Sequence, residues 1–147
     1  MTRIEDSIEI NAPPMEVWGM IAHKRLPEWF DLFKRIELTS NEDEKIGATH
    51  HMTSELYEIV KIEWDGETTQ WIENSMYSWR TIGGPFTGFG SMMLTPIDSK
   101  TKFTIVMDYE IPNSYLGKIL DRLIIHEALK SEFREGLREL KNLLEKN

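Results

Sequence analysis

Residues 114–146 read SYLGKILDRLIIHEALKSEFREGLRELKNLLEK, the longest periodic stretch in a chain of 147 residues. Apolar residues recur in it at steps of three and four, which is the pattern of an amphipathic helix. A helix of about 32 residues is about 48 Å long, so its apolar stripe needs a long surface to cover. We expect a bend near Gly136, because glycine weakens a helix interior. The stripe comprises Leu116, Ile119, Leu120, Leu123, Ile124, Leu129, Phe133, Leu137, Leu140 and Leu144.

The segment from residue 35 to 111 supplies that surface. It consists of short stretches with a period of two, separated by turn residues, and this close spacing indicates antiparallel strands. The predicted strands are KRIELTS, ATHHMTSEL, IEWDGETTQWIE, MYSWRTIG, GFGSMMLTP and TKFTIVMDYEI. In the last of these, the odd-numbered residues from Phe103 to Ile111 are apolar, so one face of the sheet is dry. Within IEWDGETTQWIE, Gly66 marks either a hairpin turn or a bulge inside one long strand.

Residues 83–90, GGPFTGFG, hold four of the nine glycines. They fit neither a dinucleotide-binding nor a phosphate-binding loop, since the required spacing and a following Lys-Ser/Thr pair are missing. Gly83-Gly84-Pro85 predicts a turn between two strands. Gly88 and Gly90 then leave one face of the next strand bare, where we expect the sheet to curl and an internal cavity to gain volume.

The N-terminal region predicts one strand and two short helices. Residues 3–10 alternate between polar and apolar side chains, although Asp6 interrupts the apolar face. NAPPMEVWGMIA, at residues 11–22, has the proline-rich start of a helix. LPEWFDLF, at residues 26–33, predicts a second helix that begins at Pro27 and buries aromatic side chains.

Composition bounds the class of protein. With 40% hydrophobic residues and a net charge of −8, the chain is expected to form one soluble domain over residues 1–147 that does not bind nucleic acid. It has no cysteine, which excludes disulfides and thiolate metal sites. Neither a signal peptide nor an apolar run of membrane-spanning length is present, so we expect a cytoplasmic protein without integral membrane association.

The order of these elements resembles the START and Bet v 1-like helix-grip superfamily, also described as SRPBCC or polyketide cyclase/dehydrase-like proteins. The resemblance covers nearly the whole chain and is carried by IEINAPPMEVWGMI (8–21), LPEWFDLF (26–33), DYEIP (108–112) and the terminal helix. It implies an α+β fold in which a curved antiparallel sheet of about seven strands wraps around the long C-terminal helix, with two short helices after the first strand. Seven strands favour the bulge at Gly66.

The resemblance further implies a cavity between sheet and terminal helix that holds a small hydrophobic or amphipathic molecule. Binding or transport of a lipid- or polyketide-like molecule is the favoured function, without a cofactor. A cyclase or dehydratase that uses the same cavity, and a co-chaperone-like interaction domain, are the alternatives. The candidate cavity residues are Trp29, His50, Met52, Trp71, Arg80, Met92, Met107, Tyr109, Ile119 and Leu123.

Two polar candidates need separate comment. His50 and His51 are neighbours on a strand and point to opposite faces, so they cannot share a metal ion, and we expect no metal site. If Met52 faces inward, His50 faces the cavity. Arg80 either points inward, where it would pair with an anionic head group or with Asp6, or lies exposed on the acidic surface.

Overall fold

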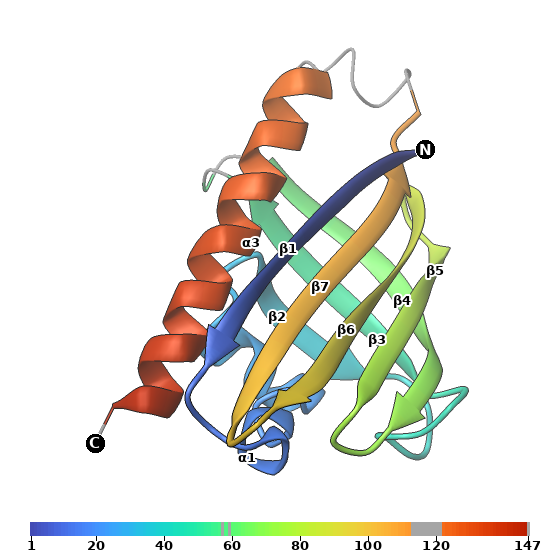
Figure 1. Ribbon diagram of the computed structural model, residues 1–147. Coiled ribbons are helices and arrows are strands. Elements are labelled where there is room, and N and C mark those ends of the chain that lie inside the picture. The colour runs from blue at the N-terminus through green and yellow to red at the C-terminus, as the bar shows by residue number, and fades with distance from the viewer. Residues whose placement is uncertain (57, 59, 113–121, 147) are drawn as a thin grey trace.

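The computed structural model describes residues 1–56, 58, 60–112 and 122–146 (Figure 1). Its elements follow the predicted order, with two short helices between the first two strands and a long helix at the end. They are β1 (Thr2–Ile10), α1 (Pro14–Trp18), the 3-10 helix η1 (His23–Glu28), β2 (Phe33–Leu38), β3 (Thr49–Leu56), β4 (Val60–Ile72), β5 (Met76–Gly83), β6 (Thr87–Ile97), β7 (Lys100–Glu110) and α3 (Arg122–Glu145).

The strands form one antiparallel sheet in the order β1-β7-β6-β5-β4-β3-β2. Figure 1 shows this sheet curved, with α3 along one side and the short helices at one end. The helix-grip fold predicted from the sequence is therefore confirmed. No helix in the described parts of the chain is long and apolar enough to cross a membrane.

The part of the predicted stripe from Leu129 to Leu140 packs against the inner face of the sheet, whereas Leu123 and Ile124 are exposed. The buried side chains of α3 belong to the same core as those of β7, where Phe103, Ile105 and Tyr109 are buried and Met107 is partly buried. Residues 114–121 of the predicted helix lie outside the described residues. At Gly136, α3 is continuous, and an added β-carbon would lie 3.3 Å from the ring of Phe30.

The predicted single strand through Gly66 is confirmed and the hairpin alternative is wrong. β4 runs unbroken from Val60 to Ile72, and its register with β5 shifts between Asp65 and Gly66. The extra residue at this shift is Ile82 of β5. A second shift, between Thr68 and Gln70, leaves Thr69 of β4 as an extra residue, and neither irregularity ends β4. The long strand can therefore follow the curvature of the sheet around the core.

The second predicted helix differs from the structure. The segment forms the 3-10 helix η1, which ends one residue after Pro27, and Phe33 already belongs to β2. Proline carries no amide N–H, so it cannot contribute a donor to a regular helical ladder. The backbone amides of Trp29 and Phe30 instead close tight turns onto the carbonyl oxygen of Leu26. The aromatic side chains are buried as predicted.

The glycines of GGPFTGFG form a turn, as expected, but do not enlarge a cavity. Gly84 has φ +118° at the turn between β5 and β6. On β6, the space next to Gly90 is filled by the indole ring of Trp79 from β5. The bare face of the strand thus accommodates a large neighbour, and the prediction of added volume is wrong.

Candidate functional site

An apolar cavity of about 50 Å³ lies between the sheet and α3. The hydroxyl of Ser54 in the cavity wall accepts a hydrogen bond from the indole N–H of Trp64 at 3.1 Å. The wall therefore offers a ligand mainly apolar contact. The cavity is lined by Leu32, Phe33, Ser54, Leu56, Ile62, Trp64, Trp79, Phe86, Met107, Tyr109, Ile111, Ile125 and Leu129.

A wider hollow of about 430 Å³ adjoins this cavity near the start of the described part of α3. Three residues, Tyr109, Ile111 and Ile125, belong to the walls of both spaces. The hollow is polar as well as apolar, and its further wall residues are Met1, Thr2, Glu110, Arg122, Leu123 and His126. A molecule in it would meet an apolar interior on one side and charged or hydrogen-bonding groups on the other.

Tyr109 and His126 form the polar contact at this junction. The Tyr109 hydroxyl and His126 Nδ1 are 3.1 Å apart and share a hydrogen bond that joins β7 to α3. Burial raises the pKa of Tyr109, so its phenol is protonated at neutral pH. The pair therefore offers a neutral hydroxyl and an imidazole to a polar group in the hollow.

The structure brings only some of the predicted cavity residues together. Met107 and Tyr109 line the apolar cavity, whereas Leu123 lines the outer hollow and is 66% exposed. Ile119 lies outside the described residues. Trp29, Met52 and Met92 lie in the packed core and not in the wall of the apolar cavity.

Arg80 lies on the outer face of the sheet, so the inward alternative is wrong. Its guanidinium pairs with the carboxylate of Glu67 on the neighbouring strand at 2.7 Å, and its side chain is 57% exposed. Asp6 does not pair with it either; this carboxylate forms an ion pair with Arg134 of α3. The exposed cation on an acidic surface is thus the correct interpretation of Arg80.

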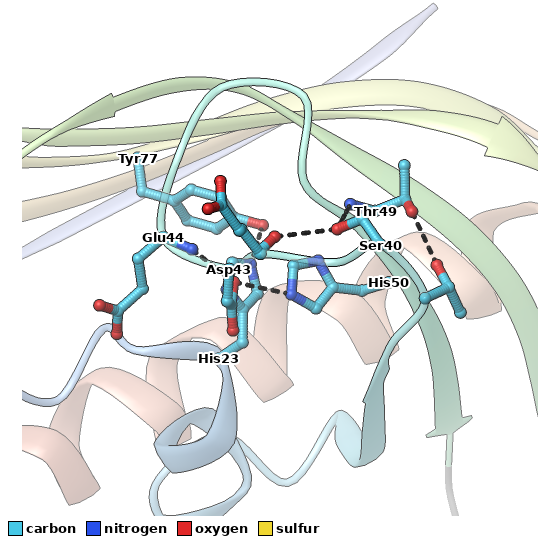
Figure 2. A network of polar contacts seen from close by, with 9 residues as sticks. His23, Ser40, Asp43, Glu44, Thr49, His50 and Tyr77 are labelled. Carbon is cyan, nitrogen blue, oxygen red and sulfur yellow. Dashed lines mark hydrogen bonds and ion pairs between the residues drawn. The ribbon is translucent and has the colours of Figure 1, made fainter.

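A second group of polar side chains, close to the short helices, lies at the opposite end of the sheet. His50 faces inward from β3, as predicted, and stacks on His23 of η1 with ring centroids 3.7 Å apart. Figure 2 shows both rings beside Asp43, which belongs to the connection between β2 and β3. His50 Nε2 and His23 Nδ1 lie 3.0 Å and 3.1 Å from the same Asp43 oxygen, Oδ1.

Aromatic side chains enclose this cluster. The ring of His23 meets that of Tyr77 edge-on, and the Tyr77 hydroxyl is 2.7 Å from His23 Nε2. Trp71, another predicted cavity residue, stacks on His23 with ring centroids 5.8 Å apart. Both histidines are buried, with side chains 1% and 2% exposed, whereas 31% of the Asp43 side chain is exposed.

The surroundings fix the charge of Asp43 and His50. Burial alone would raise the pKa of the Asp43 carboxyl, but the close approach of His23, the backbone N–H of Glu44 and the charge of both histidines hold it well below its ordinary value. Burial lowers the pKa of His50, and His23 lowers it further against the opposing effect of Asp43. At neutral pH the carboxylate is ionised and His50 is neutral.

The sequence-based interpretation missed His23, Asp43 and Tyr77. Asp43 lies in the acidic run NEDE, which is typical of a solvated loop, and His23 follows α1 without any periodic context. The one available signal was the inward-facing His50, since a buried histidine needs a hydrogen-bonding partner. Its partner could not be identified without the fold.

Comparisons with known proteins agree on the architecture. The family model described as polyketide cyclase/dehydrase and lipid transport matches residues 1–145. A search of curated proteins finds no match. The Zhui aromatase/cyclase from Streptomyces sp. R1128 superposes with a TM-score of 0.81 at 12% identity, covering 98% of this chain and 93% of that one.

For two further solved structures, the alignment covers 97% of this chain and 97% of the other chain. The protein TTHA0849 from Thermus thermophilus has a TM-score of 0.80 at 16% identity. A START superfamily protein from Mycobacterium smegmatis has a TM-score of 0.78 at 11% identity. At these identities the similarity concerns the fold alone.

Proposed function

Because the chain belongs to the polyketide cyclase/dehydrase and lipid transport family, we propose that it binds a small amphipathic molecule between the sheet and α3. The observation that carries the proposal is the shared wall of Tyr109, Ile111 and Ile125, which joins the polar hollow to the apolar cavity. The polar end of the ligand lies in the hollow, and its apolar end enters the cavity.

The two volumes define how a ligand is accommodated. Sites for small molecules enclose about 300–1,000 Å³, so the hollow of about 430 Å³ is large enough, whereas the cavity of about 50 Å³ takes only the tip of a chain. A longer apolar chain must displace cavity side chains. Met107 is suited to this movement, because methionine is unbranched and adapts to irregular space.

Binding of 1-anilinonaphthalene-8-sulfonate, an amphipathic fluorescent probe, tests the proposal, with dodecanoate as competitor. We expect saturable binding of the probe to the folded protein and its displacement by dodecanoate. Leu129→Trp places a larger side chain in the cavity wall and is expected to weaken both interactions.

Leu143→Trp is the matched control, because Leu143 lies on the same helix and is 41% exposed. It should bind the probe like the original protein. Circular dichroism and thermal melting must show that both variants are folded, since the probe also binds partly unfolded chains. Equal binding by the two variants, or no saturable binding by the original protein, would contradict the proposal.

A second candidate function, acid–base catalysis of a cyclisation or dehydration, is supported by the Tyr109–His126 pair. A hydroxyl and an imidazole in hydrogen-bond contact at a substrate-sized hollow are suitable for moving a proton. Incubation with poly-β-keto and β-hydroxyacyl thioesters tests this function. Turnover that is lost in Tyr109→Phe would support catalysis, and no turnover above background would remove it.

A further inference from the structure

We propose that His23, Asp43 and His50 bind a divalent transition-metal ion of the zinc class. One ligand atom from each residue lies within 4.8 Å of the other two. Imidazole nitrogen and carboxylate oxygen are the ligands that zinc takes in proteins besides thiolate. The site is separate from the hollow and cavity and requires no ligand in either of them.

The distances suit a metal ion of this size. Zinc lies about 2.0–2.2 Å from nitrogen and oxygen ligands, which places the ligand atoms of a tetrahedral site about 3.3 Å apart. In the cluster, Asp43 Oδ1 is 3.1 Å from His23 Nδ1 and 3.0 Å from His50 Nε2. Small side-chain movements would make room for the ion among these atoms.

His23 Nδ1 points to a ligand because it is buried and unsatisfied. It makes no hydrogen bond of acceptable geometry, although Asp43 Oδ1 lies only 3.1 Å away, and the His23 side chain is 1% exposed. A buried polar atom without a partner is unfavourable, and a coordinated cation would remove that cost.

The other atoms of the cluster orient the ligands toward one point. The Tyr77 hydroxyl contacts His23 Nε2 at 2.7 Å, which fixes the ring and leaves Nδ1 facing Asp43. The backbone N–H of Glu44 donates to Asp43 Oδ1 at 2.7 Å and holds the carboxylate in place (Figure 2). Hydrogen bonds of this kind behind the ligands are typical of metal sites.

The types of the three side chains also favour a cation. Histidine binds metals through a ring nitrogen and aspartate through a carboxylate oxygen. Three protein ligands leave a fourth position for water, which is the composition of catalytic rather than structural zinc sites.

The proposal is tested by titrating chelator-treated, full-length protein with zinc chloride in a calorimeter. We expect one tight site per chain and a rise in Tm with zinc, because an ion that binds only the folded state stabilises it. Asp43→Asn keeps the size of the side chain but removes its charge. It should weaken zinc binding by at least about 100-fold, since loss of outer-shell partners alone costs about 10- to 100-fold.

His51→Asn is the matched control. His51 is the next residue on the same strand and contacts Asp65 and Glu63 on the outer face, so the variant should bind zinc like the original protein. X-ray absorption of the zinc-loaded original protein gives a test that needs no variant, with two imidazole ligands expected. Equal affinity in Asp43→Asn, loss of binding in His51→Asn, or fewer than two imidazole ligands would overturn the proposal.

Discussion

Asp6 of β1 and Arg134 of α3 form an ion pair that fastens the first strand to the terminal helix. The guanidinium of Arg134 also contacts the backbone carbonyl oxygen of Ser7 at 3.3 Å. This contact explains why a polar residue, Asp6, lies on the apolar face of β1: its carboxylate pairs with the guanidinium of Arg134 on the helix that packs against this face. The pair is partly buried, with side chains 22% and 38% exposed.

We expect a double-mutant cycle of Asp6→Asn and Arg134→Met to give a coupling of about 1 kcal/mol in the free energy of unfolding. This value is at the upper end of the range measured for surface ion pairs, because the pair is partly buried. Urea unfolding at low and high salt measures it. The more exposed pair of Arg25 and Glu28, with side chains 44% and 49% exposed, is the control and should give a smaller coupling. Equal coupling in the two pairs would contradict this interpretation.

Gly90→Ala is expected to destabilise the fold. A β-carbon at residue 90 would come within 2.6 Å of Trp79 Cη2 and 2.8 Å of the Val106 carbonyl oxygen, so the sheet or the indole must shift. Such overpacking costs about 1–3 kcal/mol, measurable by urea unfolding. Gly19→Ala is the control, because φ is −58° there and the nearest atom is 3.4 Å away; an equal loss in that variant would contradict the steric explanation.

Glu132→Gln is expected to stabilise the protein at neutral pH. Burial raises the pKa of Glu132, and Glu135 and Asp31 raise it further against the effect of Lys34. A carboxyl group with a higher pKa in the folded than in the unfolded state weakens the fold where it is ionised, and this penalty disappears at acid pH where both states are protonated.

The gain should be on the order of 0.5 kcal/mol at neutral pH, as for like-charge pairs on a helix, and should vanish below about pH 4. Unfolding at a series of pH values measures it. Glu127→Gln serves as the control, since Glu127 is exposed beside Lys130 and should give no gain. A gain for Glu132→Gln that persists at acid pH would contradict the electrostatic cause.

Tyr109→Phe should weaken binding of dodecanoate by about 2- to 10-fold, the effect of one lost hydrogen bond, if the carboxylate lies in the hollow. Competition against the fluorescent probe measures this change. Tyr77→Phe removes a hydroxyl from the histidine cluster instead and should leave the affinity unaltered. The reverse order of effects would place the head group at the opposite end of the sheet.

The fold was predictable because its main signals are local. The alternation of Phe103, Ile105 and Tyr109 and the three- and four-residue steps of α3 depend only on which face each residue presents. Gly66 was ambiguous, and the number of strands in the superfamily resolved it. η1 was misjudged because Pro27 can begin a helix but here lies near the end of a tighter one.

The candidate sites were less predictable, because their residues meet only through the folded sheet. His23 and His50 come from η1 and β3, and the residue that joins them, Asp43, lies in a loop whose composition indicates exposure. Trp79 and Gly90 likewise become neighbours through strand register. Residue type and facing identified His50, Met107 and Tyr109 individually, but distances between elements are not encoded in the period of any one of them.

The position of β1 beside β7 has a kinetic consequence. Arg3 pairs with Asp108 across 105 residues of sequence, so β1 remains an unpaired strand until β7 has left the ribosome. At about 5–20 residues per second, this delay lasts roughly 5–20 s. Sheets with such distant pairing also fold slowly, in about milliseconds to seconds. The charged residues that alternate with isoleucine along β1 help to prevent this unpaired strand from pairing with other chains.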